Sequence, residues 1–147
     1  MNLITRDTDY AVRALCYMAQ RPEQALSVTA LCADSKLPRP YLRRVLQTLA
    51  RHRILDSCRG QGGGFRLRKD PARIFLADLI EAFQGRIDFT RCVFRASVCQ
   101  HQAACPLRKK IKAIESKAVD ELRATTILSL ISDQPAAERR RKGVRRR

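Results

Sequence analysis

Three of the six cysteines in this 147-residue chain lie in one short segment that has neither helical nor strand periodicity: Cys92, Cys99 and Cys105. The segment is polar and basic, so it has little apolar surface with which to order itself. Thiolates at spacings of seven and six residues suit a zinc ion or an iron–sulfur cluster. The fourth position falls to His101 or to a carboxylate from elsewhere, and the spacing alone does not choose between zinc and iron.

The other cysteines, Cys16, Cys32 and Cys58, fall inside expected helices and strands, where a thiol behaves as a small buried hydrophobe. Disulfides are not expected, because the first twenty residues carry charges such as Asp7 and Arg13 and do not form a secretion signal. No apolar run approaches the ~20 residues that span a bilayer. We therefore expect a cytoplasmic protein without a membrane segment.

The formal net charge is +16 at pH 7, from 30 Lys and Arg against 14 Asp and Glu. Residues 135–147 hold seven basic residues and one acidic residue, hence +6, which leaves +10 on the rest of the chain. Such an excess predicts a polyanionic partner, most simply nucleic acid. The basic tail is expected to be disordered; it either adds phosphate contacts or serves only solubility.

Hydrophobic periodicity predicts helices over residues 7–19, 28–34 and 38–52, with a tight turn before the third. Extended runs at 54–58 and 65–68 flank a glycine-rich tip, which is typical of a β-hairpin. A short helix, a turn, a basic helix and a hairpin in this order form a winged helix-turn-helix pattern. The third helix should bury an apolar stripe, which comprises Tyr41, Leu42, Val45, Leu46 and Leu49.

The opposite face of that helix and the hairpin tip carry the side chains suited to DNA. Arginine forms two hydrogen bonds with the guanine edge in the major groove, and an arginine between glycines can enter a narrow minor groove. A basic helix alone is more often a solvated face, but the ordered combination with turn and wing favours DNA. The predicted contacts are Arg39, Tyr41, Arg43, Arg44, Gln47, Arg59 and Gly60.

The C-terminal part begins with a helix from Leu76 that Gly85 ends, followed by the cysteine segment. One long helix over 106–132 then carries an apolar seam, and a seam of that length usually meets a helix of a second subunit. The expected organisation is a mainly α chain: a winged helix-turn-helix domain with a small hairpin wing, a cysteine loop, a long dimerisation helix and a basic tail. Their respective ranges are 1–85, 86–105, 106–132 and 133–147.

An enzyme is not expected. The chain has two histidines, and the glycines at the hairpin tip are not followed by Lys-Ser or Lys-Thr at a helix start, so they do not form a phosphate-binding loop.

Several stretches resemble the IscR/NsrR family (the Rrf-two type) of winged-helix transcription regulators. They include TDYAVR at 8–13, Tyr41-Leu42, SCRGQGGGFRL at 57–67 and LIEAFQG at 79–85, together with the three spaced cysteines. The resemblance covers about residues 1–132. It implies a homodimer that binds a palindromic promoter site in double-stranded DNA, usually as a repressor, with a two-iron or four-iron cluster on the cysteine trio.

The resemblance also suggests the fourth ligand. Asp9 matches an aspartate that the partner subunit donates in NsrR-type members, and Asp7 is the second choice. The position of the histidine ligand of IscR-type members is Arg108 here, so that arrangement is absent. The gap from Cys92 to Cys99 is one residue longer than the commonest spacing, which leaves the cluster type open.

The operator should differ from that of the cluster-assembly regulator, because Arg43 and Arg44 stand where that regulator has Glu and Gln. The sensed signal stays open among redox state, nitric oxide and iron. The alternative function is a zinc-stabilised basic module that binds nucleic acid without redox sensing.

Overall fold

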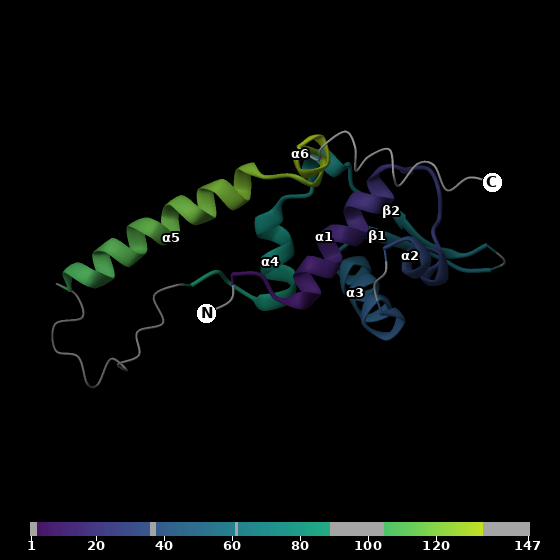
Figure 1. Ribbon diagram of the computed structural model, residues 1–147, viewed down its shortest axis with the longest axis horizontal. Helices are drawn as coiled ribbons and strands as arrows, with labels where there is room; N and C mark the ends of the chain where they lie inside the picture. Colours follow the sequence, from purple (N-terminus) through teal and green to yellow (C-terminus); the bar gives the residue numbers. More distant parts are fainter. Residues whose placement is uncertain (1–2, 36–37, 61, 89–104, 134–147) are drawn as a thin grey trace.

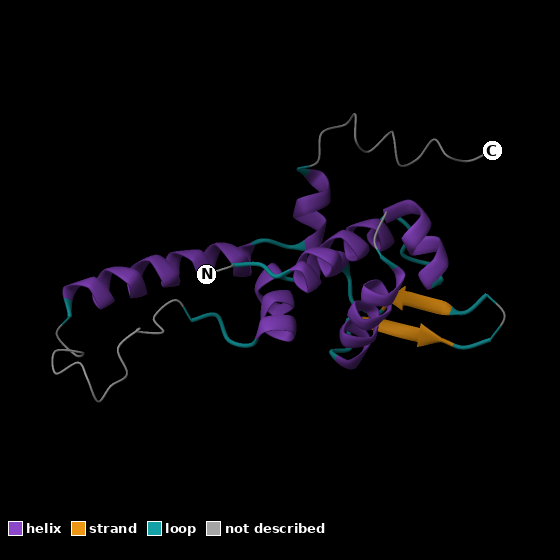
Figure 2. Cartoon of the chain, turned by 60° about the horizontal axis from the view of Figure 1, so that its bottom comes forward, coloured by secondary structure: helices purple, strands orange, loops and turns teal. Residues whose placement is uncertain are grey.

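The computed structural model describes residues 3–35, 38–60, 62–88 and 105–133. Helices dominate, and one antiparallel hairpin projects from them (Figures 1 and 2), which confirms the mainly helical fold with a hairpin wing. In chain order the elements are α1 (Arg6–Ala19), α2 (Val28–Ser35), α3 (Arg39–Arg51), β1 (Leu55–Cys58), β2 (Gly64–Leu67), the short 3-10 helix η1 (Pro71–Arg73), α4 (Leu76–Gln84), α5 (Pro106–Ala124) and α6 (Ile127–Ser132).

The helices begin and end where capping chemistry predicts. The Ser27 hydroxyl accepts a hydrogen bond from the Ala30 amide at 3.1 Å, which starts α2. Prolines 38 and 40 lie at the start of α3, where a missing N–H costs least. Gly85 ends α4 with a φ of 77°, a conformation that glycine adopts without strain.

Helix α3 anchors itself in the core through four fully buried side chains: Leu42, Val45, Leu46 and Leu49. Tyr41, which the apolar period assigns to the same stripe, is instead 52% exposed. The reason is its position on the helix: it lies on the flank one turn before Arg44, and its ring faces the Arg44 guanidinium.

The hairpin pairs β1 with β2 in a register that runs from Leu55 opposite Leu67 to Cys58 opposite Gly64. Residue 26 adds a third extended segment, because Leu26 and Phe65 exchange two backbone hydrogen bonds of 2.9 Å. A Cβ at position 64 would overlap the Leu26 carbonyl, so this close approach requires glycine. The hairpin is therefore fixed to the body through the chain that leads into α2.

The helix expected over 106–132 is two helices, because Thr125 and Thr126 are extended between α5 and α6. Thr126 caps α6: its hydroxyl accepts from the Ser129 amide at 3.1 Å, and its own amide donates to the Ser129 hydroxyl at 3.0 Å. The apolar seam continues across the break, which is why periodicity alone predicts one helix.

This extended pair, which we call the elbow (Thr125–Thr126), is held by backbone hydrogen bonds between its surroundings and residues 74–76, at the start of α4. The Leu76 amide donates to the Thr125 carbonyl at 2.9 Å, and the Ile127 amide donates to the Ile74 carbonyl at 3.0 Å. The elbow turns α6 back onto α1 and η1, where Ile127 is fully buried.

Helix α5 leaves the body and extends away from it in both views (Figures 1 and 2). It is attached by a small cluster in which Leu122 packs with Ala77 and Ile80 of α4. A larger cluster joins α1, α2, α3, the hairpin and α6 into one core. Among the described residues, no helix combines the length and the apolar character that crossing a bilayer requires.

Candidate nucleic-acid interface

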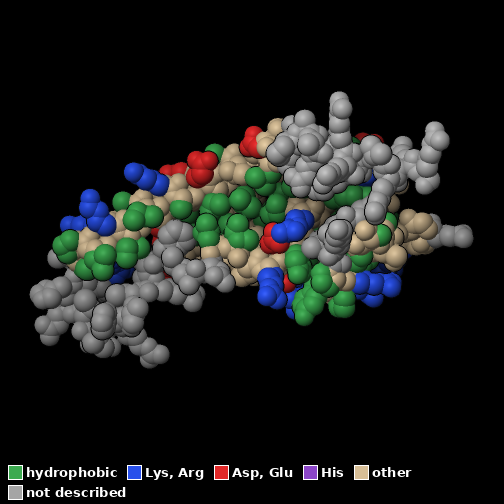
Figure 3. Space-filling model, viewed as in Figure 1, with side chains coloured by type: hydrophobic (Ala, Val, Ile, Leu, Met, Phe, Trp, Pro, Cys, Tyr) green, Lys and Arg blue, Asp and Glu red, His purple; other side chains and the backbone are tan. Residues whose placement is uncertain are grey.

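The exposed face of α3 is basic. Arg39, Arg43, Arg44 and Gln47 are all exposed, opposite the leucines and valine that hold the helix in the core. In Figure 3, Lys and Arg side chains lie along the lower edge of the molecule, where Figure 1 places α3. The sequence prediction that these side chains face solvent is therefore confirmed, whereas their contact with DNA stays a prediction.

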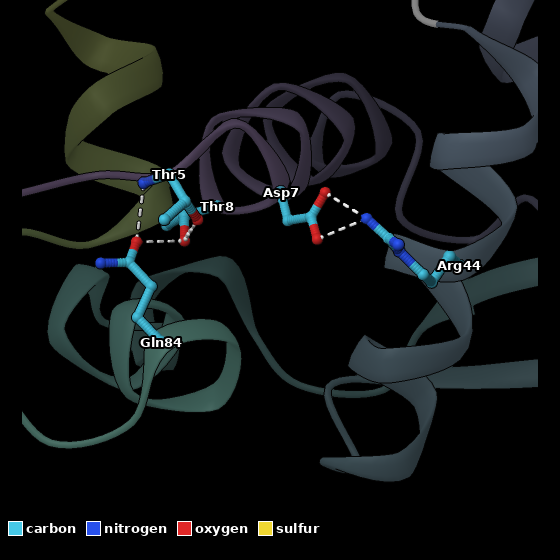
Figure 4. A network of polar contacts seen from close by, with 5 residues as sticks. All are labelled: Thr5, Asp7, Thr8, Arg44 and Gln84. Atoms are coloured by element: carbon cyan, nitrogen blue, oxygen red, sulfur yellow. Dashed lines mark hydrogen bonds and ion pairs between the residues drawn. The ribbon is translucent and has the colours of Figure 1, made fainter. Parts of the chain in front are cut away.

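Arg44 differs from its neighbours because it is held in place. Its Nη2 donates to both carboxylate oxygens of Asp7, at 2.9 Å to Oδ1 and 2.8 Å to Oδ2 (Figure 4). Its guanidinium carbon also lies 5.8 Å from the centre of the Tyr41 ring, within the range of a cation–π contact. Asp7 lies in the first turn of α1, so the pair joins the start of α1 to the exposed face of α3.

The hairpin tip provides the second predicted contact. Arg59 and Gly60 are exposed, and the tip extends beyond α3 and away from the body (Figures 1 and 2). Gly60 and Gly62 have φ values of 100° and 79°, and the Gly63 amide donates to the Gly60 carbonyl at 2.9 Å. These positive angles explain the glycines, because other residues adopt them only with strain.

The first turn of α1 is also held from its other side, by Gln84 at the end of α4 (Figure 4). The Gln84 Oε1 accepts from the Thr5 amide at 2.7 Å and from the Thr8 hydroxyl at 2.8 Å. The Gln84 Nε2 donates to the Leu3 carbonyl at 3.2 Å. Thr8 is fully buried, so Gln84 satisfies a polar group that water does not reach.

Sequence reasoning does not identify these two contacts. Asp7 and Arg44 are 37 residues apart, and Thr8 and Gln84 are 76 apart, so no local spacing relates them. The sequence offers only weak signals: Asp7 is a possible metal ligand, and Gln84 belongs to the family motif at 79–85.

The predicted metal ligands are only partly within the described residues. Cys105 is half-buried at the N-cap of α5, whereas Cys92, Cys99 and His101 lie outside the described ranges. The described residues bring together no group of three His, Cys, Asp or Glu side chains. A set of three cysteine thiols and a carboxylate fits the chemistry of an iron–sulfur cluster. The ligand assignment stays a prediction, because Cys92 and Cys99 lie outside the described ranges.

The two candidate carboxylates are both paired with arginine. Asp9 accepts from the Arg13 Nε at 3.0 Å, one turn along α1, and Asp7 holds Arg44. The start of α5, where Cys105 is the N-cap residue, lies at the end of the molecule away from the body that contains α1 (Figure 1). Asp9 and Cys105 of one chain are therefore not brought together.

The remaining cysteines follow the expectation of small hydrophobic groups in different degrees. Cys16 is buried in the core, and Cys32 and Cys58 are half-buried.

Arg68 forms an ion pair with Asp56 across the hairpin at 3.3 Å, which gives it a structural partner besides any phosphate.

The chain matches known proteins over nearly its whole described length. A family model described as "Rrf2: Iron-dependent Transcriptional regulator" matches residues 4–133. A putative HTH-type transcriptional regulator of Aquifex aeolicus is 31% identical over 125 residues, which are 84% of this chain and 87% of that protein. The HTH-type transcriptional regulator NsrR of Shouchella clausii is 25% identical over 133 residues, 89% of each chain.

Solved structures show the same fold. The cysteine regulator CymR of B. subtilis superposes with a TM-score of 0.75 at 22% identity, covering 92% of this chain and 100% of that one. IscR of T. potens superposes with a TM-score of 0.70 at 21% identity, covering 92% and 90%. Both are similar to this chain in fold.

Proposed function

Because the chain belongs to the Rrf2 family of transcriptional regulators, we propose that it represses promoters by binding a palindromic site as a homodimer, under the control of an iron–sulfur cluster. The family consists of DNA-binding regulators and not of enzymes. The observation that carries the proposal is the exposed basic face of α3, held rigidly in the core beside a glycine-tipped hairpin.

In this proposal α3 enters the major groove. Arg39, Arg43, Arg44 and Gln47 contact base edges there, with Tyr41 beside them. Arg59 and Gly60 approach the adjacent minor groove, where a narrow groove concentrates negative potential. Burial of the opposite face of α3 supports this role, because a helix that reads bases must be held firmly by its scaffold.

The dimer is proposed to form through α5. Leu107 is 67% exposed and Ile114 is 62% exposed, and their seven-residue spacing places them on one side of the helix. Ile111 and Ala118 lie on the same side and are half-buried. A helix that projects from the body, with this apolar side not covered by any of the described residues, is well suited to pack against its copy.

The cluster is proposed to lie at the start of α5, on Cys92, Cys99 and Cys105, with Asp9 of the partner subunit as fourth ligand. The separation of α1 from the start of α5 within one chain favours a carboxylate from the partner over one from the same chain. A bound cluster would supply a centre that reacts with oxidants or nitric oxide, or is lost when iron is scarce. To bind a cluster, Asp9 must give up its ion pair with Arg13.

Control of DNA binding would pass through α1, which packs against both α3 and α4. Binding of the cluster by Asp9, or its loss, would shift α1 and thereby change how α1 packs against α3. A coupling of about 1–3 kcal/mol changes operator affinity by roughly 5- to 150-fold.

The test begins with anaerobic purification. A brown protein with stoichiometric iron and sulfide supports the cluster, and a colourless protein with stoichiometric zinc supports the alternative of a zinc-stabilised nucleic-acid module. Cys92→Ala should lose iron, whereas Cys32→Ala, which alters a cysteine of α2 outside the segment, should keep it. Full iron in Cys92→Ala would refute the ligand assignment, and equal operator affinity with and without cluster would refute sensing.

A further inference from the structure

We propose that Asp7 is a specificity-determining residue, which positions Arg44 so that its guanidinium is presented to a base pair and not to the phosphate backbone. This inference rests on the proposed function, because it takes α3 as the helix that reads DNA. The sequence suggests Asp7 as a second-choice metal ligand. The role proposed here is a different one.

The contact leaves Arg44 able to bind a second partner. Within the described part of the chain, the carboxylate of Asp7 engages only Nη2 of Arg44. A guanidinium has five N–H donors, so at least three remain for acceptors on a base. The Arg44 side chain is 60% exposed and the Asp7 side chain 33% exposed, which places the free donors at the surface.

The contact also restricts where those donors point. A free arginine side chain loses considerable rotamer entropy when it docks, and an arginine that is already held loses less. Asp7 holds one end of the guanidinium and the Tyr41 ring lies against it, so Arg44 has two supports from two elements. Asp7 itself belongs to a turn that Gln84 fixes through Thr5 and Thr8.

An arginine on this face can contact either a phosphate or a base edge, and the charge of Asp7 affects the two contacts differently. A carboxylate beside Arg44 offsets its attraction to phosphate, which is a long-range effect of charge. A two-bonded contact with a guanine edge depends instead on direction and distance. The Asp7–Arg44 pair therefore weakens indiscriminate attraction and preserves directed contact, which is the combination that raises specificity.

Arg43 provides the internal comparison. It is adjacent in sequence, equally basic and exposed, but it lies about 100° around the helix from Arg44. Among the described residues the structure gives Arg43 no acidic partner comparable with Asp7. Arg43 should therefore contribute more to general attraction and Arg44 more to discrimination.

The experiment selects duplexes from a random-sequence DNA pool with the full-length protein, purified anaerobically. Affinity is then measured at one salt concentration for the selected duplex and for a shuffled duplex of the same composition. The variants are Asp7→Asn, Arg44→Ala and the double variant. The control is Asp133→Asn, which removes the same charge at the exposed end of α6.

Asp7→Asn should lower the ratio of selected to shuffled affinity about tenfold, the scale of one base contact, with equal or higher affinity for the shuffled duplex. The base pair at which preference disappears should be the one whose preference Arg44→Ala also abolishes. Asp7→Asn should have no further effect in the Arg44→Ala background, and Asp133→Asn should leave the ratio unchanged.

Three results would overturn the inference while leaving the proposed function intact: an unchanged ratio in Asp7→Asn, an equal fall in Asp133→Asn, or loss of bound iron from Asp7→Asn. If the unmodified protein selects no consensus from the pool, the proposed function fails and this inference fails with it.

Discussion

The body of the molecule and helix α5 satisfy their apolar side chains in opposite ways. In the body, α1, α2, α3, the hairpin and α6 bury their leucines and isoleucines against one another. Along α5, Leu122 near its end packs against α4, whereas Leu107 and Ile114 nearer its start are exposed among the described residues. The body thus buries its apolar side chains within one chain, whereas the apolar face of α5 has no cover from the part of the chain that the structure describes. Substitutions in the body should therefore lower the stability of the fold, whereas substitutions on the apolar face of α5 should weaken association.

The largest effect is expected from a cavity in the body. Leu46 is fully buried in α3, so Leu46→Ala should lower the free energy of unfolding by about 2–5 kcal/mol. Urea denaturation measures this change. Gln47→Ala, on the exposed face of the same helix, should change stability by no more than ~0.5 kcal/mol, and equal losses in both variants would contradict the described packing of α3.

The next effect is expected on α5, in association and not in folding. Ile114→Asp introduces a charge into the proposed dimer seam, which should raise the dimer dissociation constant about 100-fold, or roughly 2.7 kcal/mol. Analytical ultracentrifugation measures the dissociation constant, and circular dichroism should show unchanged helix content.

Ser116→Asp is the matched control, because it places the same charge on the opposite side of α5. A protein that dissociates equally with either substitution, or with neither, does not associate through the Leu107–Ile114 side.

A smaller loss is expected where α4 meets α1. Gln84→Leu leaves the Thr5 amide and the buried Thr8 hydroxyl without the Gln84 acceptor, at a cost of about 1–3 kcal/mol. Gln84→Glu keeps an oxygen that can accept from both groups and loses only the donor to the Leu3 carbonyl, so it should cost less. Thermal denaturation compares the two. Equal costs would mean that the hydrogen bonds from Thr5 and Thr8 do not contribute.

The smallest structural effect is expected from removing the basic tail. Truncation after Gln134 should leave the melting temperature and the base preference of DNA binding unchanged. If the tail binds phosphates, the log–log salt slope of DNA binding should fall by roughly 0.9 for each phosphate that the truncated protein no longer neutralises. A changed consensus after truncation would show instead that the tail reads sequence.

Sequence reasoning succeeds where structure follows from local chemistry. Ser27, Pro38 and Gly85 mark helix ends through their own backbone or hydroxyl, and the observed bounds of α1, α2 and α3 agree with the predicted ones within one or two residues. The apolar period identifies the buried side of α3. Only Tyr41, at the edge of that stripe, is misplaced.

Sequence reasoning fails where structure depends on distant partners. The elbow interrupts a continuous apolar period, because its extended shape is stabilised by the backbone of residues 74–76 and not by its own neighbours alone. The Asp7–Arg44 and Gln84–Thr8 contacts likewise join segments that only the fold brings together. The DNA contacts and the cluster ligands stay predictions, because each depends on a partner that is not part of the chain itself.

The elbow has a consequence for promoter recognition. Two short backbone hydrogen bonds set the direction in which α5 leaves the body, and in a pair joined along α5 that direction fixes the span between the two α3 helices. On B-form DNA such a span translates into the number of base pairs between half-sites. The permitted length of an operator would thus depend on two backbone hydrogen bonds at the junction of α5 and α6, and not only on the side chains of α3.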